Sequence, residues 1–269
     1  MRRWLLMILP TVVWAQQELV VPPGQVDLDD VWCTMCHEEQ GEDFGQGVHY
    51  QRGLLLCNDC HGGDTDEARE EEAKAPETGF IGKPAREDIA GICARCHKGP
   101  AEFFRMGPHA DPADRDNPTC ITCHQNHNVA DATLTLMDTT CAVCHGGEDD
   151  VALERATGIQ LALREAEQNL HVVAARFDSL GQIDAGLQRS AGLLTGAGAS
   201  LRQVEARTHS LDMEIIDESV AAVDEEIAAV QQLLDESEAS RRYRRWAVGG
   251  VWVFVVANVT LFWMKRRQL

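Results

Sequence analysis

Apolar positions are concentrated in three parts of the chain and are sparse in a Cys- and His-rich part between the first two. The first apolar run covers residues 4–14 and follows Arg2 and Arg3. A charged start, a short apolar run and a small residue at Ala15 predict a secretory signal over residues 1–15. The alternative is an N-terminal membrane anchor, but eleven residues are too few to cross roughly 30 Å of hydrocarbon.

The last apolar run covers residues 246–264 and contains nineteen residues without a charge. Lys265, Arg266 and Arg267 follow it directly. This length and these flanking charges predict a C-terminal transmembrane helix, with a buried core helix as the alternative. With an exported N-terminus, the tail at residues 265–269 is expected in the cytoplasm. The arginines before the run then lie outside, against the positive-inside tendency.

Residues 151–240 have a helical pattern. The segment lacks Pro and Cys and is rich in good helix formers. Apolar residues recur at helical spacing from Leu163 to Phe177 and again from Val204 to Leu234. Glycines at 181, 186 and within 192–198 are expected to interrupt the helices. The pattern predicts two long antiparallel helices with a shorter or kinked helix between them, forming a hairpin that packs on the preceding segment.

Residues 16–150 show neither a sustained helical nor a strand period. Pro22, Pro23 and Gly24 break the lead-in, and the charged stretch at 67–75 predicts a short solvated helix or loop. The expected fold is therefore mostly α with much irregular loop. Its expected parts are a signal peptide (1–15), a Cys/His-rich domain (16–150), a helical hairpin (151–240), a transmembrane helix (246–264) and a short tail (265–269).

The chain is acidic, with 24 Lys and Arg against 43 Asp and Glu and a net charge of −19. Nucleic acid is excluded as a partner because phosphate binding needs a basic face. Residues 16–150 alone carry 27 acids and 9 bases. Bases outnumber acids only beside the two terminal apolar runs, as expected next to a membrane.

The ten cysteines form five copies of one motif, Cys-x-x-Cys-His. The copies are Cys33, Cys36 and His37; Cys57, Cys60 and His61; Cys93, Cys96 and His97; Cys120, Cys123 and His124; and Cys141, Cys144 and His145. This spacing is the c-type haem attachment signature, in which two thiols bind the porphyrin and the His is an axial iron ligand. Zinc sites, redox disulfides and structural bridges also use paired cysteines, but none of them needs a His after every second Cys.

Five haems in 113 residues would supply the apolar interior that this segment lacks. Glycine pairs follow two of the motifs, at 62–63 and at 146–147. They would permit close or left-handed backbone beside a ring, although ordinary turns explain them equally well.

Five histidines lie outside the motifs and match five irons that each need a sixth ligand. They are His49, His109, His127, His171 and His209. The first three in loop-like sequence are the stronger candidates; His171 and His209 lie in the helical region, where a packed or surface role is the alternative. The thioethers of Met35, Met106 and Met137 are alternative ligands that would raise the potential of a haem.

The motifs and the histidines between them resemble the class III multihaem cytochromes c over residues 32–147. The added long helices and membrane anchor are similar to two further groups. One comprises the membrane-anchored quinol-dehydrogenase cytochromes, whose anchor is usually N-terminal. The other comprises the pentahaem nitrite reductases and hydroxylamine oxidoreductases; this chain lacks the Cys-x-x-Cys-Lys motif common in nitrite reductases and is short for that class.

The resemblance and the motifs imply a haem-cored, exported, membrane-anchored cytochrome c with five covalent haems. We expect it to pass single electrons between a membrane redox complex, quinol dehydrogenase or quinol pool and a soluble or membrane-bound redox protein, with its C-terminal helix in the lipid bilayer. An electron carrier is expected if every iron has two His ligands. Two alternatives are an oxidoreductase of a small nitrogen or sulfur oxyanion at one open haem, and a haem-based sensor.

Overall fold

The computed structural model describes residues 26–111, 114–147, 150–180 and 185–267. The predicted signal peptide lies outside these residues. The described chain is mostly helical and contains no strand, as the sequence predicts. It divides into two units. The N-terminal unit comprises Met1–Pro84 and His124–Asp131, and the C-terminal unit comprises Ala85–Cys123 and Ala132–Leu269.

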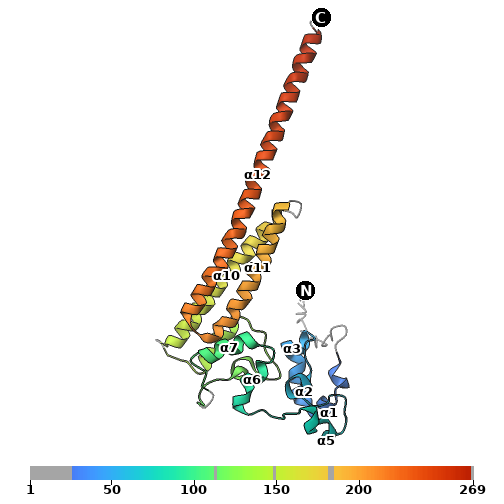
Figure 1. The fold of residues 1–269 in the computed structure, drawn as a ribbon, viewed down its shortest axis with the longest axis vertical. Helices are drawn as coiled ribbons and strands as arrows, with labels where there is room; N and C mark the ends of the chain where they lie inside the picture. The colour runs from blue at the N-terminus through green and yellow to red at the C-terminus, as the bar shows by residue number, and fades with distance from the viewer. Residues whose placement is uncertain (1–25, 112–113, 148–149, 181–184, 268–269) are drawn as a thin grey trace, which may run out of the picture. The chain divides into compact units, whose positions relative to one another are not determined.

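The N-terminal unit consists of short helices joined by turns (Figure 1). They are η1 (Leu28–Asp30), α1 (Trp32–Cys36), α2 (Glu38–Gln46), α3 (Val48–Gln51), α4 (Cys57–His61), α5 (Glu70–Ala73) and η2 (Pro76–Thr78). The short helix α5 confirms the prediction for the charged stretch at 67–75. Among the described residues of this unit, only three apolar side chains are buried: Val31, Phe44 and Tyr50.

The C-terminal unit begins with short helices and continues into three long ones. The short elements are η3 (Arg86–Asp88), α6 (Ile89–Cys93), α7 (Lys98–Met106), α9 (Thr135–Thr140), η4 (Cys141–Val143) and η5 (Thr208–Ser210). Helix α8 (Cys120–His124) contains the boundary between the units, which falls after Cys123.

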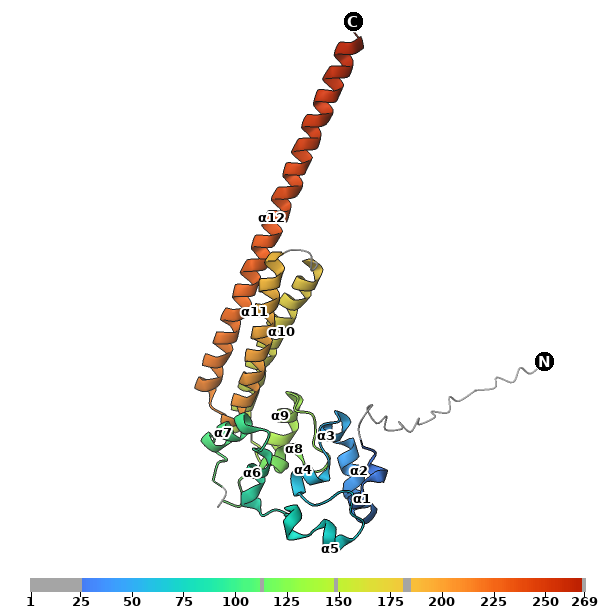
Figure 2. The ribbon, with the colours of Figure 1, turned by 45° about the vertical axis from the view of Figure 1, so that its right-hand side comes forward.

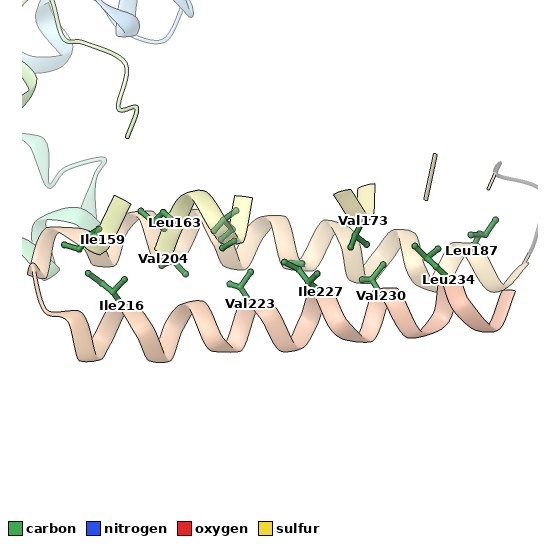
Figure 3. Packing of buried hydrophobic residues seen from close by; sticks show 13 residues of the cluster. Ile159, Leu163, Val173, Leu187, Val204, Ile216, Val223, Ile227, Val230 and Leu234 are labelled. Atoms are coloured by element: carbon green, nitrogen blue, oxygen red, sulfur yellow. The ribbon is translucent and has the colours of Figure 1, made fainter. Parts of the chain in front are cut away.

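The long helices α10 (Val151–Leu180), α11 (Ala185–Arg207) and α12 (Met213–Arg267) form a bundle (Figures 1 and 2). Their facing side chains make the one hydrophobic core cluster of the described chain, drawn in Figure 3. The α12 residues of this cluster recur every three to seven positions, which keeps them on one helix face. They are Ile216, Val223, Ile227, Val230 and Leu234.

The predicted hairpin is therefore a three-helix bundle. Gly181, one predicted break, lies outside the described residues, directly after the end of α10 at Leu180, whereas the breaks predicted at Gly186 and within 192–198 were wrong. Gly192, Gly196 and Gly198 lie inside α11, and Gly186 is its second residue. A Cβ added at Gly192 or Gly196 would meet no atom within 4 Å, so these glycines sit in a continuous helix without requiring a turn.

The break between α11 and α12 lies at residues 208–212 and was not predicted from the sequence. Leu211 has a left-handed backbone (φ 52°), and the Asp212 carboxylate accepts a hydrogen bond from the Glu214 amide at 2.9 Å. An aspartate that caps the first free amides of a helix is a strong start signal, and it fixes where α12 begins.

The bundle ends before α12 does. Leu234 is the last buried residue of α12, and the helix continues to Arg267. This helix is the one candidate membrane span among the described residues, with a mean hydropathy of 1.8 in its most apolar window and none of that window buried. The structure therefore has an exposed apolar C-terminal helix long enough to cross a membrane, continuous with the bundle and not a separate element.

Candidate functional site

The five Cys-x-x-Cys-His motifs share one local backbone structure. In α4 and α8 the whole motif is helical. In the other three motifs the His amide donates to the carbonyl of the first Cys, at 3.0 Å for His37, 2.8 Å for His97 and 3.0 Å for His145. One helical turn places side chains three positions apart on the same face, so each motif can present both thiols to one group.

The second cysteine of each motif differs in exposure from one motif to the next. Cys36, Cys96 and Cys144 are exposed, whereas Cys60 and Cys123 are partly buried. None of the five forms a disulfide. The attachment role stays a prediction for Cys60, Cys96 and Cys144, because it depends on a haem beside each motif.

The close thiol pairs join the first cysteines of different motifs. The Cys33 thiol hydrogen-bonds with Cys57, and the Cys93 thiol with Cys120. Burial raises the pKa of Cys57 to about 11. A redox-active dithiol needs a lowered thiol pKa, so a buried, poorly ionised thiol argues against that alternative. Cys120 differs, because the hydrogen bond from Cys93 lowers its pKa to about 7.

In the N-terminal unit, His61 of the second motif faces His127 across a gap. The two ring centroids are 6.2 Å apart with an interplanar angle of 33°. His61 Nδ1 lies 2.8 Å from the carbonyl oxygen of Gly82, so this nitrogen is engaged and Nε2 is left for another partner. Burial lowers the pKa of His127, which keeps this imidazole neutral and able to donate a lone pair.

Glycines bring the backbone around this pair together. Gly62 and Gly63, directly after His61, have φ values of 67° and 86°. A Cβ on Gly62 would strike the backbone of Gly79, so close approach as well as the left-handed backbone requires glycine there. A Cβ on Gly47 would lie 2.6 Å from the carbonyl oxygen of His127. Gly146 and Gly147 have no such neighbours, so the ordinary-turn explanation suffices for that pair.

In the C-terminal unit, His145 of the fifth motif faces His109 in the same way. Their ring centroids are 6.3 Å apart with an interplanar angle of 37°. His145 Nδ1 lies 3.6 Å from an Asp150 carboxylate oxygen. Burial, with the neighbouring His145 as a second cause, lowers the pKa of His109.

His209 lies beside His97 of the third motif. It belongs to η5, the turn between α11 and α12, and not to a long helix as the sequence suggested. Its Nδ1 lies 3.1 Å from the carbonyl oxygen of Ala206. Burial lowers the pKa of His209, and His97 is a further cause. A Cβ on Gly107 would lie 2.9 Å from the carbonyl oxygens of His209 and Ser210, so this glycine allows η5 to pack on the end of α7.

The His–His spacing fits an iron between two imidazoles. A metal–imidazole bond of about 2.0–2.1 Å, and a ring nitrogen roughly 1.15 Å from its centroid, give centroids roughly 6.4 Å apart across one metal. The observed 6.2 and 6.3 Å agree with this value. No group of three or more metal-ligating side chains occurs in the described residues. A haem iron needs only two protein ligands, because the porphyrin supplies the other four.

The remaining three histidines near the motifs lie in the N-terminal unit. His37 ends the first motif and is exposed, and His49 is half-buried in α3. His124 ends α8, and its carbonyl oxygen accepts a hydrogen bond from the Ala130 amide at 3.1 Å. This bond closes the short loop that carries His127.

His171 is the predicted ligand that the structure places away from any motif of its own unit. It is exposed on α10, about 16 Å along the helix axis from Gln160, where α9 meets α10. Of the three candidate methionines, Met137 packs against the bundle core, whereas Met35 and Met106 are exposed.

Sequence reasoning missed the groups that orient the histidines. These groups are the backbone carbonyls of Gly82 and Ala206 and the carboxylate of Asp150. A backbone carbonyl leaves no sequence signal, and Asp150 is one acid among many. Comparisons of the chain with protein-family models, curated proteins and solved structures gave no match.

Proposed function

We propose that the chain is a membrane-anchored pentahaem cytochrome c that carries single electrons. The observation that supports this proposal best is the repeated pairing of a motif His with a non-motif His, at 6.2 Å for His61–His127 and 6.3 Å for His109–His145. Zinc would need three or four protein ligands at one site, and a disulfide would need no histidine. Paired imidazoles beside paired thiols suit haem c.

The residues have distinct roles in this proposal. The ten motif cysteines hold the five porphyrins covalently, and the motif histidines bind the irons from one side. His127, His109 and His209 bind from the other side of the second, fifth and third haems. The carbonyl oxygens of Gly82 and Ala206 engage Nδ1 of His61 and His209 and so direct Nε2 to the metal, and the Asp150 carboxylate lies 3.6 Å from Nδ1 of His145. When bound, the irons supply one-electron chemistry by cycling between the ferric and ferrous states.

The sparse apolar burial around the motifs supports the same proposal. Of the buried apolar residues described, five precede residue 148 and fourteen lie in the three-helix bundle. A segment with so few buried side chains cannot supply the apolar burial of an ordinary core. Apolar side chains within the motifs themselves are exposed, namely Met35, Ile121 and Val143. Bound porphyrins would provide the missing apolar surface.

Attachment of haem c takes place outside the cytoplasm, so the proposal includes export by the N-terminal signal. The C-terminal helix then anchors the protein in the membrane with residues 265–269 in the cytoplasm. The acidic charge favours a redox partner with a basic docking face and a salt-sensitive association.

Intact mass and spectroscopy test the proposal together. The mature protein should exceed the mass of its signal-cleaved polypeptide by five haems after the non-covalent cofactors are extracted with acidified acetone. EPR should show low-spin iron with two axial histidines at the second, third and fifth haems. Purified protein that contains zinc and lacks iron would refute the proposal.

A second candidate function, reduction or oxidation of a small nitrogen or sulfur oxyanion, has one observation in its favour. The N-terminal unit contains three motif histidines, His37, His61 and His124, but only two others, His49 and His127. Three irons with two imidazoles each would need six. One iron there could therefore have an open position, although the net negative charge of residues 16–150 disfavours anion binding. High-spin iron that binds carbon monoxide or nitrite in the unmodified protein would favour this candidate.

A further inference from the structure

Helix α12 sets a distance between the C-terminal unit's motifs and the candidate membrane span. The helix begins at Met213, three residues after η5, and the uncharged run begins at Trp246. Thirty-three residues of α-helix correspond to about 50 Å along the axis. His209, the proposed ligand of the third haem, lies in η5 at the far end of this distance.

The fifth motif lies at the same end of the bundle. Helix α9, directly before this motif, receives hydrogen bonds from Gln160 Nε2 to the Leu134 carbonyl oxygen and the Asp138 carboxylate, both at 2.7 Å. Asn169 of α10 hydrogen-bonds to Asp224 of α12. Gln160 precedes Asn169 by nine residues in α10. It therefore lies level with the first turn of α12, which precedes Asp224 by a similar length of helix.

The connection between this end and the span has no break among residues 213–267. Buried side chains between Ile216 and Leu234 hold the first part of α12 in the bundle. Directly after this part, Asp235 and Glu238 form ion pairs with Arg176 of α10. The part from 235 to 245 contains neither Gly nor Pro. Sharp bends in helices occur at such residues, so α12 can act as a rigid rod.

We propose that the bundle and α12 form a stalk that holds the third and fifth haems of the proposed cytochrome about 50 Å from the membrane surface. Tilts of transmembrane helices reach about 40°, and at that tilt the height is still roughly 38 Å. A quinone ring inside the bilayer cannot come close to these haems, and electron transfer falls steeply with distance. The redox partner of these two haems is therefore the extramembranous part of another redox protein, not a quinol dissolved in the lipid.

The electron balance of this step is simple. One electron passes between a haem iron and the partner's redox group, so that one is oxidised as the other is reduced, and no bond forms or breaks. The stalk itself is acidic, with 16 acids and 6 bases in residues 151–240. A partner that approaches along it would need a basic face.

Electron microscopy of the full-length, haem-loaded protein in lipid nanodiscs measures the height directly. The density that contains the third and fifth motifs, here called the motif-bearing density, should lie about 50 Å from the disc surface. Insertion of seven helix-forming residues after Ser240 should increase this height by about 10 Å, because it lengthens the rod without touching a proposed ligand. Motif-bearing density lying on the disc, or an unchanged height after the insertion, would overturn the stalk.

A second measurement tests access by quinones. Protein in vesicles is reduced with dithionite and then mixed with a quinone, which takes one electron from each of two haems and two protons from water. A water-soluble quinone should oxidise the third and fifth haems at least tenfold faster than a long-tailed quinone with the same ring confined to the bilayer. Equal rates would overturn the inference. The inference rests on the proposed function, so haem content is measured first. Absence of haem would refute that function, and the height measurement would then decide the stalk separately.

Discussion

Replacing His209 by Ala is the sharpest test of the proposed iron ligands. His209 lies beside His97, is oriented by the Ala206 carbonyl oxygen at 3.1 Å, and has a lowered pKa because it is buried. Removing this imidazole should leave the third haem with one axial histidine. One haem in five, and thus about 20% of the iron signal, should change from low spin to high spin and bind carbon monoxide.

His171→Ala is the matched control. His171 is also a histidine of residues 151–240, but it is exposed on α10 and lies about 16 Å along the helix from the level of Gln160. This variant should keep the spin state of every haem. EPR and carbon monoxide difference spectra of both variants measure the change.

His209→Met distinguishes a ligand from a merely structural residue. A thioether can replace the imidazole on the iron and should restore low spin while raising the potential of one haem. Low-spin iron in all three variants would show that His209 is structural. A high-spin change in His171→Ala alone would refute the reasoning from position.

Three further predictions concern packing and charge. Gly47→Ala places a Cβ 2.6 Å from the His127 carbonyl oxygen, so the loop must move by several tenths of an ångström. The visible circular dichroism of the second haem should therefore shift. A Gly146→Ala control should leave the spectrum unchanged, because a Cβ there meets no atom within 4 Å. Leu163→Ala opens a cavity in the bundle core and should lower the free energy of unfolding, measured with denaturant, by about 2–5 kcal/mol; a loss below about 1 kcal/mol would contradict the packing shown in Figure 3. Burial raises the pKa of Tyr50, so above about pH 10 the folded chain retains a proton that the unfolded chain loses. The free energy of unfolding should therefore be independent of this group below about pH 10 and should fall above it. The variant Tyr50→Phe should lack this fall.

Local chemistry explains why much of the candidate site could be predicted from sequence. The five motifs needed no fold, because attachment requires only two thiols and a His within one helical turn. The pairings could not be predicted. His127 lies opposite His61 because Gly47 and the bond from the Ala130 amide to the His124 carbonyl oxygen position its loop. The contact between Gly47 and His127 joins distant segments of the chain.

The helical region shows the same difference. The apolar period correctly indicated long amphipathic helices, but it gave no reliable position for their ends. Glycines 192–198 suggested a break because glycine is a poor helix former, yet they lie within α11, where packing against α10 and α12 outweighs propensity. The break between α11 and α12 is marked in the sequence by Asp212, whose side chain caps the start of α12. The apolar pattern gave no sign of this break.

The sequence by itself determined the five Cys-x-x-Cys-His motifs, the acidic charge and the apolar terminal helix, since each depends on residues that are close together in the chain. Only the tertiary structure decided which histidines face one another, because a pair such as His109 and His145 forms through packing of distant segments. It also decided that His209 lies in the turn η5 near His97, whereas His171 is exposed on α10 away from the motifs of its own unit. Both lie in the helical region, and the direction and length of α10 and α11 determine which of them returns to the motif-bearing end of the bundle.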